Sequence, residues 1–152
     1  MSDSALKTQL QSDMKSSMKS GDKARLLVIR NILAGIKQIE VDERIELDDA
    51  RVIAVLDKMS KQRRESIAQF STAGRDDLIQ IEAAELEIIQ EYLPEALSDA
   101  EIEAEVEAAI QTTAASSIKE MGKVMGLLKP KLQGRADMGK VSQLIKSRLT
   151  SA

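Results

Sequence analysis

The chain has 152 residues, with 22 Lys and Arg against 25 Asp and Glu, a formal net charge of −3, and neither His nor Cys. These absences exclude thiolate nucleophiles, imidazole bases, disulfides, and the usual zinc, haem and iron–sulfur sites. With 43% hydrophobic and 31% charged residues, the composition is that of a folded globular protein and not of a disordered chain.

Apolar residues recur every three or four positions along the first half of the chain, and this spacing predicts helices. We expect a first helix from about Asp3 to Ser20 and a second helix capped by Asp22. A third helix follows Asp48. A fourth helix takes Asp76 as its cap and is broken by Leu93-Pro94, because the residue before a proline avoids the helical region.

The second half carries helix-start signals of its own. The segment Ser98–Glu101 has the capping-box pattern, in which a hydroxyl and a Glu satisfy the first free amides, so a fifth helix should start at Asp99. A second capping box at Ser117–Glu120 predicts a sixth helix, closed by Pro130. Asp137 then caps a seventh helix, and no strand-like alternation competes with this interpretation.

The predicted fold class is therefore all-α. We expect a four-helix N-terminal domain, residues 1–93, and a small three-helix C-terminal domain, residues 94–152, with the boundary at the Leu-Pro junction. No apolar stretch is long enough to cross a bilayer, and the first residues lack the charged and apolar regions of a signal peptide. We therefore expect a cytoplasmic protein with no membrane partner.

The net charge conceals a strong asymmetry along the chain. Residues 77–115 hold 11 acidic residues and no Lys or Arg, whereas residues 116–152 hold eight basic residues and only two acidic ones. A basic segment of this kind indicates an anionic partner. The alternative is that the acidic and basic segments neutralise each other.

Two glycines, Gly122 and Gly126, stand one turn apart in the predicted sixth helix. Each costs about 1 kcal/mol of helix propensity relative to Ala, so a compensating contact is expected. Either another helix or a phosphate–sugar backbone approaches closely at this surface, because both need a helix face without Cβ atoms.

Basic residues surround these glycines and the turn at Gly134. The start of the seventh helix offers backbone amides beside Lys140 and Arg135, and together they could hold one anion such as a phosphate. The alternative is an ordinary solvated helix face. The basic residues of this segment are Lys119, Lys123, Lys129, Lys131, Arg135, Lys140, Lys146 and Arg148.

A second basic cluster, Lys61–Glu65, lies late in the third helix, and Arg75 follows it at the next turn. Salt bridges to the acidic middle segment are one use for it, and a second RNA-binding patch is the other. The acidic segment itself has Glu pairs three or four positions apart, but without His or a matching motif on another helix we expect no metal site and no cofactor. Those residues are Glu82, Glu85, Glu87 and Glu91.

Several short motifs together resemble one known family. They are Lys61–Ile67, Ala73–Leu78, Glu91–Pro94, Met121–Gly126 and Gly134–Asp137 with the following Val141. In this combination and order they are similar to the YqeY proteins of the GatB/YqeY group, and the likeness runs along nearly the entire chain.

The resemblance implies an all-helical protein whose C-terminal part is similar to the tail domain of GatB, a subunit of the glutamine-dependent tRNA amidotransferase. In that enzyme the tail helps to hold the tRNA. The resemblance assigns RNA contact to Lys123, Arg135 and Lys140, and it gives Gly122, Gly126 and Gly134 the role of shaping the surface. The basic cluster adds Lys119, Lys129 and Lys131 as RNA-binding candidates.

These observations predict a tRNA-binding accessory protein, associated with tRNA amidation or aminoacylation and without catalytic residues of its own. The sequence has neither a Cys nucleophile nor a phosphate loop, both of which an amidotransferase would need. One alternative is a module that docks on an aminoacyl-tRNA synthetase or amidotransferase subunit. Another is a component with carbon–nitrogen ligase activity that uses glutamine as amido-N donor, the label usual for the family.

Overall fold

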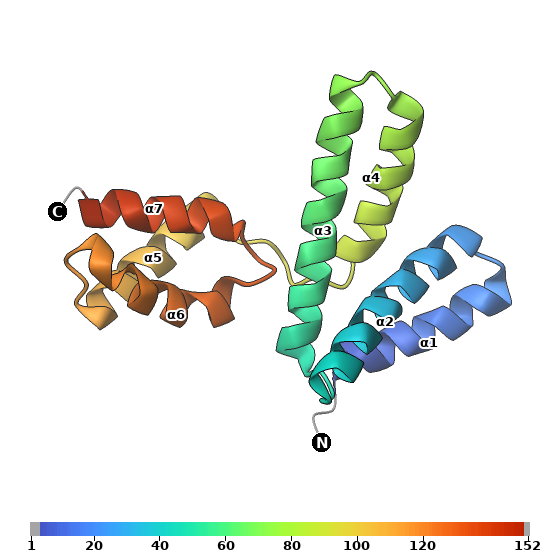
Figure 1. Ribbon diagram of the computed structural model, residues 1–152, viewed down its shortest axis with the longest axis horizontal. Coiled ribbons are helices and arrows are strands. Elements are labelled where there is room, and N and C mark those ends of the chain that lie inside the picture. The colour runs from blue at the N-terminus through green and yellow to red at the C-terminus, as the bar shows by residue number, and fades with distance from the viewer. Residues whose placement is uncertain (1–3, 151–152) are drawn as a thin grey trace. The chain divides into compact units, whose positions relative to one another are not determined.

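The computed structural model describes residues 4–150, and in this range the chain forms seven α-helices, one 3₁₀ turn and no strand (Figure 1). The all-α class predicted from the sequence is confirmed. No helix among the described residues is both long enough and apolar enough to cross a bilayer. The elements in chain order are α1 Ala5–Ser20, α2 Lys23–Glu43, α3 Asp49–Thr72, α4 Asp76–Gln90, α5 Asp99–Thr113, the 3₁₀ turn Ile118–Glu120, α6 Met121–Leu132 and α7 Met138–Thr150.

Local capping fixes several helix starts where the sequence predicts them. Asp22 and Asp48 each accept a hydrogen bond from the backbone N–H three residues later, at 3.1 and 2.9 Å. The capping box of α5 is complete, because the Ser98 hydroxyl accepts from the Glu101 amide and the Glu101 carboxylate reaches back to the Ser98 amide. These bonds satisfy amides that have no partner within the helix.

Two other helix starts differ from the prediction. α1 begins at Ala5, with Ser4 as its cap, and the predicted start at Asp3 lies outside the described residues. Asp76 does not cap α4. It lies in the first turn of that helix, and Arg75 holds the N-cap position without a side-chain cap bond. A carboxylate in the first turn is still favoured by the helix dipole.

The predicted start of the sixth helix is wrong. Ser117 makes no side-chain cap bond, and a 3₁₀ turn separates it from α6, which begins at Met121. The Glu120 carboxylate instead accepts from the amide and the hydroxyl of Ser116, both at 3.2 Å. The acidic member of the predicted box is thus used, but by the serine one position earlier.

Pro130 does not close α6 as predicted. It lies inside the helix, which continues to Leu132. A proline removes one N–H donor, and here the loss falls in the last turn, where the Gln133 amide donates to the Lys129 carbonyl at 3.0 Å. Because Leu128 and Leu132 are both buried on one side, packing holds the last turn in helical form.

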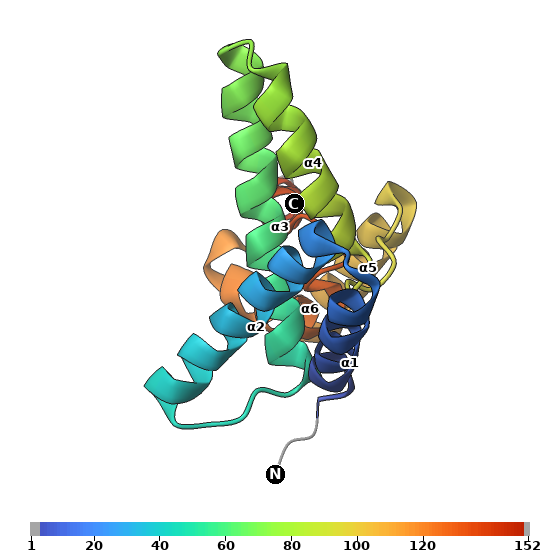
Figure 2. The same ribbon diagram turned by 90° about the vertical axis from the view of Figure 1, so that its right-hand side faces the viewer.

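The chain clusters into two compact units, and the division in the sequence falls between Leu93 and Pro94. In the first unit, α1 and α2 form one antiparallel pair and α3 and α4 form another (Figures 1 and 2). Arg25 of α2 pairs with Glu91 at 2.7 Å, and the Tyr92 hydroxyl donates to Asp13 of α1. The pKa of Tyr92 is raised, first by burial and then by this bond. The core of the unit is Leu10, Val28, Ile29, Ile32, Ile36, Leu47, Val52, Val55, Leu56, Ile89 and Tyr92.

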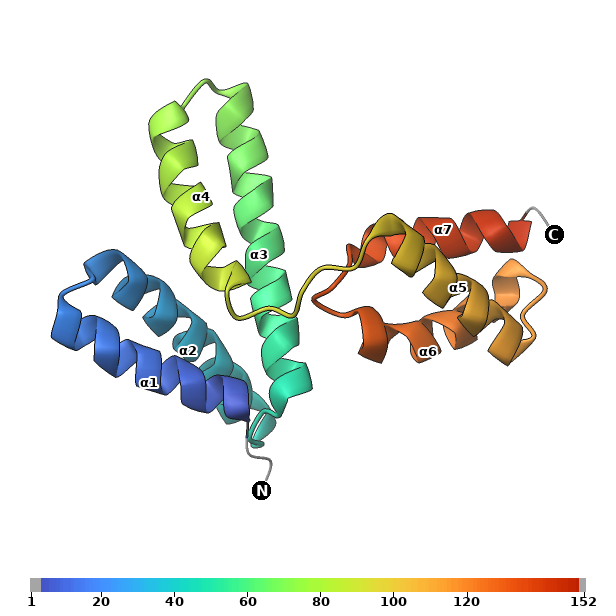
Figure 3. The same ribbon diagram turned by 180° about the vertical axis from the view of Figure 1, so that it is seen from behind.

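In the second unit, α5, α6 and α7 all pack against one another around a core of their own (Figure 3). The turn before α7 needs Gly134, whose φ of 79° lies in the left-handed region. That these two units are separate domains stays a prediction. The core of the second unit is Val106, Ala109, Val124, Leu128, Leu132, Val141, Ile145 and Leu149.

Candidate functional site

The outward face of α6 has a bare backbone. Gly122, Gly126 and Pro130 follow one another at four-residue spacing and are exposed, on the side opposite the buried Val124 and Leu128. A Cβ added at either glycine would meet nothing within 4 Å. Close approach of another helix of this chain, one of the two predicted explanations for the glycines, is therefore wrong for the described residues, and the surface is open.

Lysines lie around this bare face without ion pairs. Helical geometry places Lys123 on one side of the glycine row and Lys129 on the other, because they stand one residue after Gly122 and three after Gly126. Lys131 points from another side of α6. Across residues 4–150, no salt bridge forms at any of the exposed lysines Lys119, Lys123, Lys129, Lys131, Lys140 and Lys146.

Among the residues that the structure describes, only one ion pair joins the basic segment to the acidic one. Arg148 of α7 pairs with Glu107 of α5, and it is the single cation of residues 116–152 in a salt bridge within the described part of the chain. The alternative interpretation, in which the two segments neutralise each other, is thus limited to this arginine. The six lysines are therefore available to an external anion.

Arg135 has a structural use that the sequence did not indicate. It is partly buried, and its side-chain Nε donates to the Glu95 carbonyl at 3.1 Å. The Arg135 carbonyl accepts from the Leu97 amide at 2.8 Å. Arg135 thus ties the segment before α5 to the turn before α7. Its predicted contact with RNA stays a prediction.

The anion site predicted at the start of α7 is not formed as expected. The Gly139 amide donates to the Asp137 carboxylate at 2.9 Å and is not free. This carboxylate also places a negative charge where a phosphate would sit, and Arg135 is directed to the Glu95 carbonyl instead. The physical reason is helix capping, because the carboxylate of the residue before α7, Asp137, already accepts from an amide of the first turn.

One arginine of the second basic cluster, Arg63, joins α3 to α4. The Arg63 guanidinium lies 2.7 Å from the Glu85 carboxylate and 3.4 Å from that of Glu82. Arg75 pairs with Asp77 at 3.1 Å. For these two arginines the salt-bridge interpretation is confirmed. No group of three or more acidic residues within the described range is arranged to hold a metal ion.

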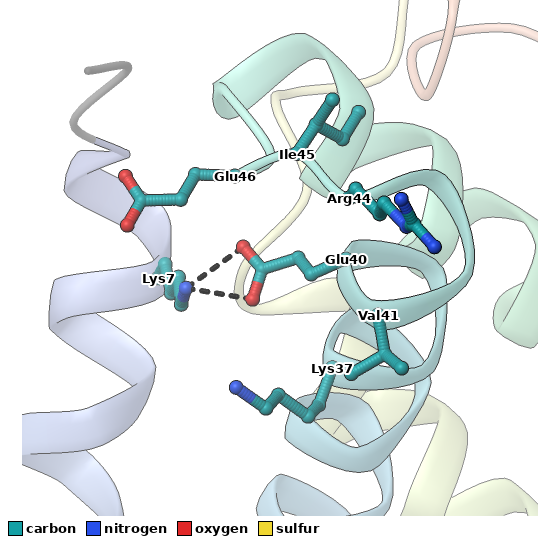
Figure 4. Close-up of a pocket in the computed structure, with 7 residues that line it drawn as sticks. All are labelled: Lys7, Lys37, Glu40, Val41, Arg44, Ile45 and Glu46. Carbon is teal, nitrogen blue, oxygen red and sulfur yellow. Dashed lines mark hydrogen bonds and ion pairs between the residues drawn. The ribbon is translucent and has the colours of Figure 1, made fainter.

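A pocket of about 350 Å³ lies between α1 and the C-terminal end of α2 (Figure 4). Its centre is the ion pair between Lys7 and Glu40, whose Nζ and Oε2 atoms are 2.8 Å apart. The Glu40 carboxylate also accepts from the buried Leu47 amide at 3.0 Å. The bond from Lys7 and then that from Leu47 hold the pKa of Glu40 below its ordinary value, although burial opposes the shift. The lining residues are Lys7, Lys37, Glu40, Val41, Arg44, Ile45 and Glu46.

Sequence reasoning did not identify this pocket. A signal was present, because Glu40 occupies the position four residues after the buried Ile36, where the apolar stripe of α2 would continue. A charged residue on a buried stripe needs a partner. Figure 4 shows Lys37 and the Glu40 carboxylate directed to the same side of α2, whereas the Arg44 guanidinium points away.

Comparison with known proteins gives a family match over nearly the whole chain. The family described as Yqey-like protein matches residues 7–149. This confirms the resemblance that the sequence motifs predicted. The match includes both compact units and therefore the open face of α6 and the pocket beside α2.

Three relatives carry the same name, Altered inheritance of mitochondria protein 41, mitochondrial. The protein from Eremothecium gossypii is 41% identical over 85 residues, which are 55% of this chain and 46% of that protein. The one from Lachancea thermotolerans is 38% identical over 85 residues, with the same shares. The one from Pyrenophora tritici-repentis is 30% identical over 129 residues, or 84% of this chain and 71% of that protein. The chain thus matches about half the length of the first two relatives.

The cytoplasmic location expected from the sequence is wrong on this finding. Each of these relatives is named as a mitochondrial protein. The expectation rested on the lack of a spanning apolar stretch and of a signal-peptide pattern, and neither feature distinguishes one water-filled compartment from another.

Proposed function

The chain belongs to the YqeY-like protein family, and from that membership we propose that it is a non-catalytic accessory protein that binds tRNA. Its role is to hold or present tRNA for amidation or aminoacylation. The surface that binds is the open face of α6 together with Lys140 at the start of α7. Contact runs to the phosphate–sugar backbone and to the shape of the folded RNA.

The observation that carries this proposal is the set of exposed lysines, unpaired within the described residues, around the two open glycines of α6. Gly122 and Gly126 leave room for a close approach, since an added Cβ would meet nothing within 4 Å. Lys123 and Lys129 flank them and have no ion pair within residues 4–150. A phosphate backbone needs both properties, a surface without Cβ atoms and unneutralised cations beside it.

The chemistry of the chain favours binding over catalysis. Without Cys or His, it has no thiolate to release ammonia from glutamine and no imidazole to transfer protons. No phosphate loop is present to hold ATP. Recognition of tRNA through backbone charge needs none of these groups.

The test is binding of bulk tRNA to the full chain over a salt series, with wild type and two matched triple variants. Lys123→Glu, Lys129→Glu and Lys140→Glu together should lower the affinity at least tenfold. They should also flatten the slope of log affinity against log salt by about 2–3, at roughly 0.7–0.9 for each lost phosphate contact. The control variant, Lys15→Glu, Lys19→Glu and Lys58→Glu, changes the net charge equally in the first unit.

The control variant should keep most of the affinity. Circular dichroism of both variants should match wild type, because all six lysines are exposed. Equal losses in the two triple variants would mean non-specific charge attraction and overturn the proposed surface. Absence of tRNA binding by wild type at low salt would overturn the function itself.

One observation also favours a second candidate, a module that docks on an aminoacyl-tRNA synthetase or amidotransferase subunit. The same open face of Gly122 and Gly126 admits a partner helix as readily as an RNA backbone. Retention of a synthetase or amidotransferase subunit on the immobilised chain after nuclease treatment supports docking. Its release by nuclease supports tRNA as the link.

A further inference from the structure

A second exposed helix face, on α2, carries an apolar row. Leu27, Ala34 and Val41 are spaced by seven residues and lie on the side opposite the buried Ile32 and Ile36. Leu27 is 57% exposed and Val41 is 60% exposed, the two highest values among the large exposed hydrophobic residues of the described chain. Such a row of aliphatic side chains in water is unfavourable unless it is covered at least part of the time.

A row of cations runs beside the apolar row. Lys23, Arg30 and Lys37 have the same spacing of seven residues, and each lies one turn before its apolar neighbour. They span about 21 Å at 1.5 Å per residue. All three are exposed, and none forms a salt bridge within the described residues. The other flank of the apolar row carries Asn31 and Gln38, and the Gln38 amide donates to the single acidic residue on that side, Asp42, at 3.0 Å.

The two rows end at the pocket described above. Lys37 and Val41 belong to both the rows and the lining of the pocket, and Ile45, 42% exposed, extends the apolar surface past the end of α2. Leu27, Ala34 and Val41 are all exposed, so no other described segment of the chain covers this row. The face is thus open along its length and hollowed at one end.

We propose that this face of α2 binds an acidic amphipathic helix of a partner protein. The partner helix would place apolar residues on Leu27, Ala34 and Val41, and Asp or Glu residues beside Lys23, Arg30 and Lys37. An apolar row and a charged row with the same seven-residue period match one core position and one flanking position of a helix–helix seam. The proposal concerns a different unit from the tRNA surface and does not depend on it.

Other occupants fit these observations less well. An RNA backbone makes use of the cations but not of the aliphatic row. A lipid surface requires only an apolar and a basic side, not a fixed period of seven residues. A second copy that met this face with its own α2 face would bring cations or amides opposite the cations, because neither flank of this face carries an acidic row.

The probe for the test is a labelled synthetic helical peptide of 21 residues, with Leu in a seven-residue repeat and Glu in a parallel row, measured by fluorescence anisotropy with the full chain. One control peptide has the same composition in permuted order. We expect the periodic peptide to bind at least tenfold more tightly than the permuted one. Equal affinity of the two peptides, or no binding by either, would overturn the proposal.

Two pairs of variants locate the binding on α2. Leu27→Gln with Val41→Gln, and separately Lys23→Glu with Arg30→Glu, should each lower peptide affinity at least tenfold. A peptide with Lys in place of Glu should restore binding to the charge-reversed variant, which general unfolding cannot do. The matched control, Lys15→Glu with Lys58→Glu, should bind like wild type.

Two further measurements separate this proposal from its competitors. The triple variant at Lys123, Lys129 and Lys140 should bind the periodic peptide normally, so loss of tRNA binding and loss of peptide binding are distinguishable. Vesicles of anionic phospholipid, or bulk tRNA, should not displace the peptide at low micromolar concentration. Displacement by either one, lost in the α2 variants, would assign the face to that ligand and overturn the helix proposal.

Discussion

The outward faces of α2 and α6 both carry positive charge, but different residues lie beside the cations on each helix. Both have exposed cations without ion pairs in the described part of the chain. Beside its cations, α2 presents Leu27, Ala34 and Val41, whereas α6 presents Gly122 and Gly126, where an added Cβ would meet nothing within 4 Å. The cations alone attract any anion. The residues beside the cations determine which anionic surface can approach. Apolar side chains favour an apolar partner, whereas exposed glycine backbone favours a phosphate–sugar chain.

The largest expected effect comes from a core substitution beneath the α6 face, which should leave the α2 face intact. Leu128, 1% exposed, lies beneath the α6 face in the core of the second unit. Leu128→Ala should lower the free energy of unfolding of that unit by about 2–5 kcal/mol. In a unit of this small size, such a loss should abolish tRNA binding at moderate temperature.

Hydrogen exchange measured by mass spectrometry checks this prediction. Amides of α6 should exchange faster in Leu128→Ala, and amides of α2 should keep their protection. The control is Ile118→Ala, at a residue that is 44% exposed. It should change the free energy of amide protection in α6 and in α2 by no more than about 0.5 kcal/mol. Parallel loss of protection in α2 would show that the two faces depend on one cooperative unit.

The next effect concerns the support of the α2 face. Glu40→Gln keeps an acceptor for the Leu47 amide but loses the ion pair with Lys7. It should lower the free energy of unfolding of the first unit by about 1.5–3 kcal/mol, the range for a hydrogen bond to a charged group. Chemical denaturation followed by circular dichroism measures this loss. A control at the exposed pair with Glu43, Arg51→Gln, should cost clearly less, because solvent screens this pair.

The same substitution makes a prediction for pH. Because the pKa of folded Glu40 is lowered from 4.5, its contribution to stability is present above pH 4.5 and is lost as the pH falls through the folded value. Wild type should therefore lose more stability than Glu40→Gln on acidification below pH 4.5. Parallel pH curves for the two proteins would contradict the assigned role of this carboxylate.

The substitutions with the smallest expected effect on stability test the exposed glycines of α6 most directly. Gly122→Ala with Gly126→Ala should raise the free energy of unfolding by about 1–2 kcal/mol, because both sites are helical and open. The same variant should weaken tRNA binding, since two methyl groups then stand between the backbones. A stabilised variant with unchanged tRNA affinity would show that RNA does not contact these two glycines. Thermal melts and the tRNA assay are measured on the same samples.

Helix starts that depend on neighbours in the chain could be predicted from the sequence. Asp22, Asp48 and Ser98 cap their helices through bonds that reach only three residues ahead. The exposure of the α6 lysines also follows the helical period and needs no distant contact. The family followed from the order of several short motifs, each of which is local.

Only the tertiary structure determined which charged groups, among the described residues, form hydrogen bonds or ion pairs with distant parts of the chain. Arg135 and Lys129 look alike in the sequence, but only Arg135 meets a carbonyl from 40 residues away. Glu40 is held by Lys7, and Pro130 stays within α6 because its neighbours pack into a core. The physical reason is range: a cap or a turn is fixed by atoms a few residues apart, whereas an ion pair depends on which helices meet.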